Sequence, residues 1–244
     1  GAMSMALGDQ TSLADRKRRA GQRMFIGIFG HAVDEDARKL IAELQPAGFV
    51  IFARNVAEPA QVLDLNRELA SLVDAHRPAL ISVDQEGGRV ARVRKPATEF
   101  PPMRVLGRAN DLALTAQVGS VMARELRAMG FHLDFAPVGD VDSNPDNPVI
   151  GDRSFGPEPK AVSDHVAAYI RGMQAEHIIA CIKHFPGHGD TDTDSHRALP
   201  VVAREIEALR ALELPPFRAA IAAGVGTVMT SHVMFPAWDE EWPA

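Results

Sequence analysis

The stretch "HIIACIKHFPGHGDTDTDSHRALP", residues 177–200, joins a short apolar run to a loop rich in histidine and aspartate. Its apolar part, residues 177–185, is one of six such runs in the chain. The other five cover residues 24–30, 48–53, 79–84, 131–137 and 225–233. Continuous apolar runs of this length are typical of parallel strands that helices cover on the outside. We therefore expect these runs to form a parallel sheet.

Amphipathic segments fill most of the intervals between the runs. They span residues 34–44, 59–76, 114–130, 159–176 and 205–224. An apolar stripe at helical spacing marks the second of them, formed by Val62, Leu65, Leu69 and Leu72. The pair Pro215-Pro216 should interrupt the last one, since proline disrupts a helix interior. This alternation of strand and helix predicts the α/β class with a parallel sheet.

Polar residues gather directly after the predicted strands, as in Asp84-Gln85-Glu86, at Asp140, and in Lys183-His184. In a (β/α)8 barrel, the loops that follow the strands build the active site at one face. A dinucleotide-binding fold is less favoured, because "GHAVDE" after the first run lacks a Gly-x-Gly-x-x-Gly turn. We predict a TIM-type barrel of which about six β/α units are present.

The composition is that of an ordinary globular chain, with 244 residues, 46% hydrophobic and 24% charged. The net charge of −6 argues against a nucleic-acid-binding surface, and no apolar run reaches the ~18 residues of a membrane helix. The only cysteine, Cys181, lies in an apolar run and is interpreted as a buried core residue. We expect residues 1–23 to hold a tag remnant and a leader helix, and residues 24–244 to form one barrel domain.

The histidine- and aspartate-rich loop allows three interpretations. Asp194 and His196 are two apart, so in extended backbone they project to the same side and could form an acid/base unit. Alternatively, the loop could hold a metal ion, although it has no familiar metal-binding spacing. The candidate ligands are His184, His188, Asp190, Asp192, Asp194 and His196. The third possibility is a loop braced by its own Asx turns.

Three further positions are candidates for the same site. Asp84 should leave its strand toward the barrel mouth with Arg89 and Arg92 close behind, suited either to sugar hydroxyls or to bracing a loop. Arg153, in "GDRSFG", leaves the same two possibilities open. His232 lies near the end of the last predicted run and could face the site or be a hydrogen-bonded core histidine, of which we expect the second.

Five segments resemble glycoside hydrolase family 3, specifically its single-domain bacterial β-N-acetylhexosaminidases. They are "VDQEGGRVARV", "FAPVGDVD", "GDRSFG", "IKHFPGHGDTDTDSHRALP" and "MTSHVMFPAWD", in the family's order and across essentially the whole chain. The resemblance implies a cytoplasmic retaining glycosidase on a (β/α)8 barrel, without metal or organic cofactor. Its substrates would be saccharides with a terminal N-acetylglucosamine, from cell-wall muropeptides or chitin-type oligosaccharides. A monomer is expected for the complete barrel.

The resemblance also implies roles for individual residues. His196 would be the general acid/base, oriented by Asp194. Sugar binding would fall to Asp84, Arg92, Arg153, Lys183 and His184. In the family, the nucleophile is an aspartate at the end of the seventh strand, in a segment resembling "FSDDL". The 244 residues contain six predicted strands and no match to that segment. We expect activity to need this missing carboxylate. Two alternatives are a non-catalytic sugar-binding relative and a metal-dependent barrel hydrolase.

Overall fold

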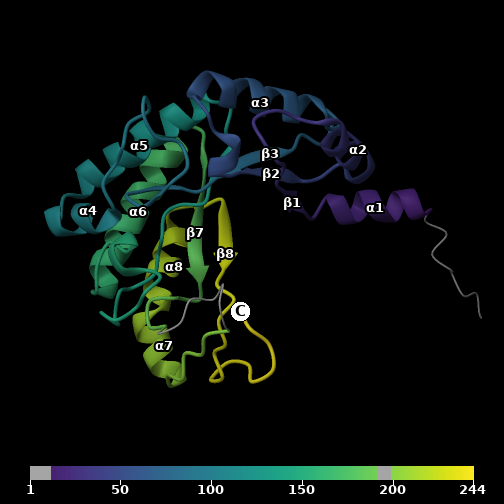
Figure 1. Cartoon of the computed structure of the whole chain (residues 1–244). Helices are drawn as coiled ribbons and strands as arrows, with labels where there is room; N and C mark the ends of the chain where they lie inside the picture. The colour runs from purple at the N-terminus through teal and green to yellow at the C-terminus, as the bar shows by residue number, and fades with distance from the viewer. Residues whose placement is uncertain (1–11, 192–198) are drawn as a thin grey trace, which may run out of the picture.

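The computed structural model describes residues 12–191 and 199–244 of the chain (Figure 1). Six parallel strands pair in the order in which they follow one another along the chain. They curl into an open half-barrel, and each predicted apolar run contains one of them. The strands are β1 (Phe25–Ile26), β2 (Gly48–Ile51), β3 (Leu80–Val83), β6 (Leu133–Asp134), β7 (Ile179–Phe185) and β8 (Thr227–Thr230).

Helices cover the outer face of the curled sheet, as Figure 1 shows. The five amphipathic segments all contain helices, and the proline pair divides the last segment between two of them. The helix break falls at Glu213, and Pro215 and Pro216 lie in the first turn of the next helix, where proline is tolerated. The helices are α1 (Leu13–Gly21), α2 (Glu35–Leu44), α3 (Pro59–Ser71), α4 (Met103–Ala109), α5 (Leu112–Ala128), α6 (Pro159–Ala175), α7 (Ile206–Leu212) and α8 (Leu214–Ala222).

Side chains that fix the helix starts are visible in the sequence. Asp34 accepts a hydrogen bond from the backbone N–H of Ala37 at the start of α2, and Asp111 accepts one from Leu114 at the start of α5. Pro59 opens α3, where its missing N–H costs nothing. The predicted stripe of α3 is buried at Val62, Leu65 and Leu69, and Leu72 is partly buried at the helix end. These contacts hold α3 against the sheet.

A small hairpin follows β3 that was not predicted. It pairs β4 (Gln85–Gly87) with β5 (Val90–Ala91) in antiparallel fashion. Its turn uses Gly87 at φ +100° and Gly88 at φ +57°, conformations that favour glycine. Short 3-10 turns, η1 (Ala53–Asn55) and η2 (Gly151–Arg153), lie in the loops after β2 and β6. One residue from each strand of the hairpin, Glu86 and Val90, lines the cavity described below.

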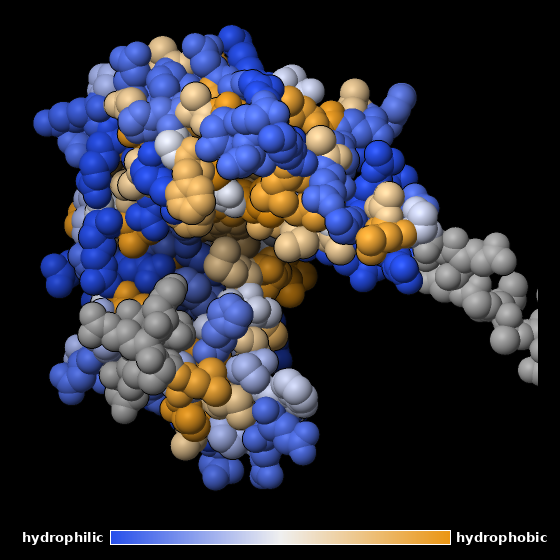
Figure 2. All heavy atoms as spheres, turned by 45° about the vertical axis from the view of Figure 1, so that its right-hand side comes forward, coloured by the Kyte–Doolittle hydropathy of each residue, from blue (hydrophilic) through white to orange (hydrophobic). Residues whose placement is uncertain are grey.

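The sheet has two open edges in the described part of the chain, because β1 pairs only with β2 and β8 only with β7. Apolar side chains such as Phe25, Phe29 and Val228 are exposed near these edges. Figure 2 shows hydrophobic residues along the hollow of the molecule. None of the helices within residues 12–191 and 199–244 combines the length and apolar character that crossing a bilayer requires.

Candidate active site

A cavity of about 530 Å³ opens at the carboxyl ends of β3, β6 and β7. Three valines, two phenylalanines and a methionine form the apolar part of its wall, and two hydroxyl side chains and eight titratable residues form the rest. All five predicted sugar-binding residues line it, namely Asp84, Arg92, Arg153, Lys183 and His184. Glu86, His188 and His232 complete the titratable lining. The structure thus brings together side chains that are far apart in the sequence.

Lys183 is the buried centre of an ion cluster at the base of the cavity. Its ammonium group lies 2.6 Å from Glu86 Oε1 and 2.9 Å from Asp84 Oδ1, although the side chain is only 2% exposed. Burial alone would lower the pKa of Lys183, but the charges of Glu86 and Asp84 outweigh it and raise the pKa. Lys183 therefore stays charged and holds two strand ends together.

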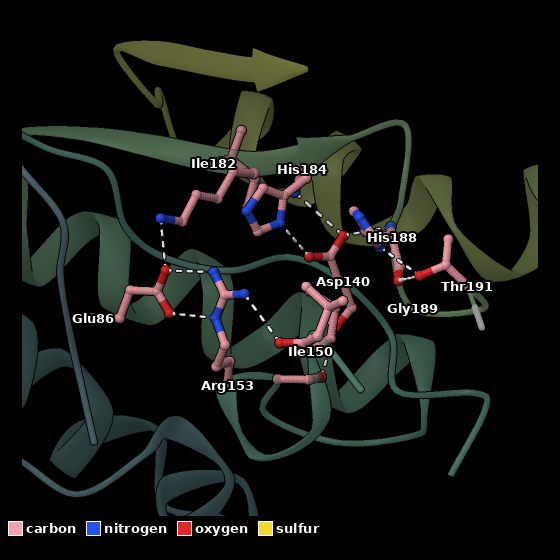
Figure 3. Close-up of polar contacts among 12 residues, drawn as sticks. Glu86, Asp140, Ile150, Arg153, Ile182, His184, His188, Gly189 and Thr191 are labelled. Atoms are coloured by element: carbon pink, nitrogen blue, oxygen red, sulfur yellow. Dashed lines mark hydrogen bonds and ion pairs between the residues drawn. The ribbon is translucent and has the colours of Figure 1, made fainter. Parts of the chain in front are cut away.

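Arg153 binds the same Glu86 through two parallel hydrogen bonds (Figure 3). Nε lies 2.9 Å from Oε2, and Nη2 lies 2.8 Å from Oε1. Burial would raise the pKa of Glu86, but Lys183 and Arg153 outweigh it and lower the pKa to about 2. Arg92 sits at the rim, 3.8 Å from Asp84. Arg153 also braces its own loop through a hydrogen bond of 3.1 Å to the carbonyl oxygen of Val149. It lines the cavity as well, and its binding of a sugar stays a prediction.

A second carboxylate, Asp140, organises the histidine side of the cavity. It is fully buried after β6, and its Oδ2 lies 2.7 Å from Nδ1 of His184. Its Oδ1 accepts the backbone N–H groups of His184 at 3.2 Å and His188 at 2.7 Å. Burial would raise the pKa of Asp140, but the contacts with His184 and His188 lower it overall. Because Nδ1 is held by Asp140, Nε2 of His184 is the nitrogen left for a ligand.

His188 is held from the side away from the cavity. Its Nδ1 lies 2.6 Å from the hydroxyl of Thr191, and Nε2 has no hydrogen-bond partner among the described residues. Burial lowers the pKa of this imidazole, despite the nearby Asp140 carboxylate. A neutral His188 with a free ring nitrogen is suited to exchange a hydrogen bond with a ligand hydroxyl.

Asn147 joins the loop after β6 to the loop after β7. Its amide nitrogen donates to the carbonyl oxygens of His188 at 2.8 Å and Gly189 at 3.0 Å. Its amide oxygen accepts the N–H groups of Val149 at 2.8 Å and Ile150 at 3.0 Å. One side chain therefore satisfies backbone groups of both loops and holds them as a unit.

One sequence expectation is wrong, and for another residue the structure favours one of the two alternatives that were left open. His232 is exposed and lines the cavity, with φ +56°, so the expectation of a buried core histidine was wrong. The strand before it ends at Thr230, and the left-handed backbone of His232 leaves its side chain exposed between the buried Ser231 and Val233. Arg89 donates to the carbonyl oxygen of Val149 at 2.6 Å and lies near Asp152, so it braces the loop and does not line the cavity.

The proposed acid/base pair, Asp194 and His196, lies outside the described residues, as does Asp192. Among residues 12–191 and 199–244, no three His, Cys, Asp or Glu side chains are placed to hold a metal ion. Since the suggested ligand set includes all three of these undescribed positions, the metal interpretation remains a prediction. The same holds for the acid/base unit.

Glu86 and Asp140 are site residues to which sequence reasoning assigned no role. Both follow predicted strands, and that position was the available signal. Their partners lie 67 and 44 residues away, at Arg153 and His184, so only the fold reveals the contacts. Glu213, buried behind the loop after β7, had no signal at all because it lies within a helical pattern.

Comparison with known proteins identifies the family. The model of the "Glycosyl hydrolase family 3 N terminal domain" matches residues 17–244. A β-hexosaminidase of Stenotrophomonas maltophilia is 43% identical over 219 residues, covering 87% of this chain and 64% of that relative. The chain thus spans just under two thirds of the length of this relative.

Solved structures give the same result. A family 3 β-N-acetylglucosaminidase from Paenibacillus sp. superposes with TM-score 0.90 at 46% identity, over 93% of this chain and 44% of that one. NagZ from Neisseria gonorrhoeae, in complex with N-trifluoroacetyl-D-glucosamine, superposes with TM-score 0.84 at 35% identity, over 88% of this chain and 65% of that one. The half-barrel is therefore the fold of part of these enzymes, and the chain belongs to glycosyl hydrolase family 3.

Proposed function

We propose that this chain forms the sugar-binding part of a retaining β-N-acetylhexosaminidase that removes terminal N-acetylglucosamine. The observation that carries the proposal is the convergence of Asp84, Arg92, Arg153, Lys183 and His184 on one cavity. Family membership supports it, since relatives at this similarity are named β-hexosaminidase or β-N-acetylglucosaminidase.

The charges of the cavity favour an uncharged polyol as the ligand. Lys183 and Arg153 are matched by Asp84 and Glu86, so the base of the cavity carries fixed donors and acceptors with little net charge. Carboxylates accept hydrogen bonds from sugar hydroxyls, and guanidinium and ammonium groups donate to them. Because Lys183 and Arg153 are both paired with carboxylates, the described residues offer no free pair of cations at the base of the cavity to bind a phosphate or carboxylate ligand.

The proposed reaction is a double displacement. A carboxylate attacks the anomeric carbon while His196 gives a proton to the leaving glycosidic oxygen, and a glycosyl-enzyme ester forms. Water then attacks the same carbon, His196 takes its proton, and the ester bond breaks to release the sugar with retained configuration. In this proposal Asp194 orients His196, and the nucleophile is supplied from outside the 244 residues.

We further propose the biological setting that the motif resemblance implies. The substrates would be muropeptides from cell-wall recycling, or chitin-type oligosaccharides, handled in the cytoplasm by a monomer with a complete barrel. The reaction requires neither a metal ion nor an organic cofactor, because side chains supply proton transfer and the covalent intermediate.

Binding and turnover test the proposal separately. Calorimetric titration of the chain with N-acetylglucosamine should detect binding, and Asp84→Asn should weaken it at least tenfold. The matched control Asp152→Asn changes an exposed aspartate of the neighbouring loop and should leave the affinity unchanged. Failure of the folded chain to bind the sugar would contradict the assignment.

Turnover distinguishes the alternatives. The complete enzyme should hydrolyse an aryl N-acetyl-β-glucosaminide, whose leaving group is activated. His196→Ala should lower the rate more on substrates with poor leaving groups than on this aryl glycoside. Equal losses on both would count against proton delivery by His196. Sugar binding without turnover by the full-length protein would favour the non-catalytic relative, and loss of activity with a chelator would favour the metal-dependent hydrolase.

A further inference from the structure

Glu213 is a buried acid that the proposed mechanism does not use. It lies at the junction of α7 and α8, where its backbone N–H donates to the carbonyl oxygen of Leu209 at 2.9 Å. Its side chain is 1% exposed, and neither carboxyl oxygen has a hydrogen-bond partner among the described residues. Such an environment favours the neutral, protonated form of an acid.

The carboxyl group of Glu213 packs directly behind the loop that carries His184 and His188. A Cβ atom built on Gly187 would lie 2.3 Å from Glu213 Oε2, so the carboxyl group occupies the space beside that glycine. On the other side, the same loop is held by Asp140, which accepts three of its N–H groups. This segment, residues 183–191, comprises the end of β7 and the loop after it, and is therefore held between two carboxyl groups.

These two carboxyl groups are in opposite protonation states. Asp140 is a carboxylate that accepts hydrogen bonds from the loop. Burial and the negative charge of Asp140 raise the pKa of Glu213 to about 8, and Asp190 adds to this effect. Arg204 opposes it, but its guanidinium is already paired with Asp190. Glu213 is thus protonated at neutral pH and ionises in mildly alkaline solution.

We propose that Glu213 is a positioning residue whose protonated carboxyl group holds residues 183–191 in the sugar-binding arrangement, and that loss of this proton releases the loop. An ionised Glu213 would add a negative charge beside Asp140 and Asp190, without a hydrogen-bond donor from the described residues. Water would have to reach it, and the packing against Gly187 would open. The inference depends on the proposed function only in assigning a sugar to the cavity.

Hydrogen–deuterium exchange tests the loop without reference to a sugar. The exchange of peptides covering residues 183–191 should be the same in wild type and Glu213→Gln at pH 7. At pH 9, wild type should exchange several-fold faster, roughly up to tenfold, because about ten in eleven molecules are then ionised. Comparing both proteins at one pH removes the intrinsic pH dependence of exchange. An equal increase in both proteins would overturn the proposal.

Two further variants keep the result interpretable. Glu207→Gln, an exposed glutamate on α7, is the matched control and should behave like wild type. Should Glu213→Gln fail to fold, Glu213→Met supplies an apolar side chain of similar length and should also show no alkaline increase in exchange. A wild-type-like increase in Glu213→Met would equally overturn the proposal.

Sugar binding gives the functional readout. The dissociation constant of wild type for N-acetylglucosamine should rise about tenfold from pH 7 to pH 9, and that of Glu213→Gln should stay constant. Parallel weakening in both proteins would count against the role of Glu213. If neither protein bound the sugar at any pH, the proposed function would fail, while the exchange experiment would still decide the role of Glu213.

Discussion

Asp140 holds the ring of His184 through a contact of 2.7 Å between Oδ2 and Nδ1, and it holds the backbone of the same residue through Oδ1. One buried carboxylate therefore sets both the position and the orientation of a cavity-lining imidazole. A change at Asp140 should therefore disturb both the ring and the backbone of His184.

Asp140→Asn should weaken binding of N-acetylglucosamine at least tenfold and lower the free energy of unfolding by about 1–3 kcal/mol, because an amide NH2 would face an N–H donor. Calorimetric titration and urea unfolding measure the two effects. Asp146→Asn is the control, since Asp146 is exposed in the same loop. Unchanged affinity in Asp140→Asn would show that His184 does not need this orientation.

Lys183→Met should destabilise the fold severely. The change removes the cation between Asp84 and the buried Glu86, and breaking a buried ion pair costs about 3–5 kcal/mol, although Glu86 keeps its contact with Arg153. Urea unfolding should show this loss, whereas Lys160→Met, at an exposed pair with Asp164, should change stability by under about 1 kcal/mol. A loss below about 1 kcal/mol in Lys183→Met would mean that the cluster does not stabilise the fold.

Acid stability should depend on Glu86. Its pKa is about 2 in the folded protein and 4.5 in the unfolded chain, so the unfolded state binds the proton first as the pH falls. The stabilisation is fully present above pH 4.5, is lost as the pH falls through the folded value of about 2, and amounts to roughly 3 kcal/mol. Urea unfolding between pH 2 and 6 should show a steeper slope for wild type than for Glu86→Gln. Identical slopes would exclude Glu86 as the source.

Cys181 should be inert in the folded protein. It is 2% exposed, and burial raises the pKa of its thiol, so little of the reactive thiolate is present and reagents cannot reach it. Ellman's reagent should detect one thiol per chain in denaturant and almost none under native conditions, as the sequence has one cysteine. Fast native reaction would show that the strand opens readily.

The strands were predictable because each lies in a continuous apolar run. A parallel strand that is buried on both faces needs apolar residues at successive positions, so the run is recognisable in the sequence. The hairpin of β4 and β5 was not predictable, because Gly87 and Gly88 indicate a tight turn without specifying which residues pair across it. The helix α4 was missed because a helix of seven residues is too short to show a clear periodicity.

Some residues of the site were likewise predictable from the sequence, and others were not. Polar residues after strands, such as Asp84 and Lys183, were identifiable from their position in a barrel pattern. The function of Glu86 was not, because it depends on Lys183 and Arg153, which reach it only through the fold. Glu213 illustrates the extreme case, since its environment comes from tertiary packing and its own segment predicts only helix.

The hydrogen bonds by which Asn147 joins the loop after β6 to the loop after β7 have a consequence for proteolysis. Residues 135–158 contain little regular structure, and such segments are ordinarily where proteases cut. Here the backbone is tied to the next loop by Asn147, and the side chain of Arg153, only 13% exposed, is occupied by Glu86. Trypsin must bind an arginine side chain in an extended, accessible segment. It should therefore leave the Arg153–Ser154 bond intact until the domain unfolds, so an irregular loop would resist digestion as well as a strand does.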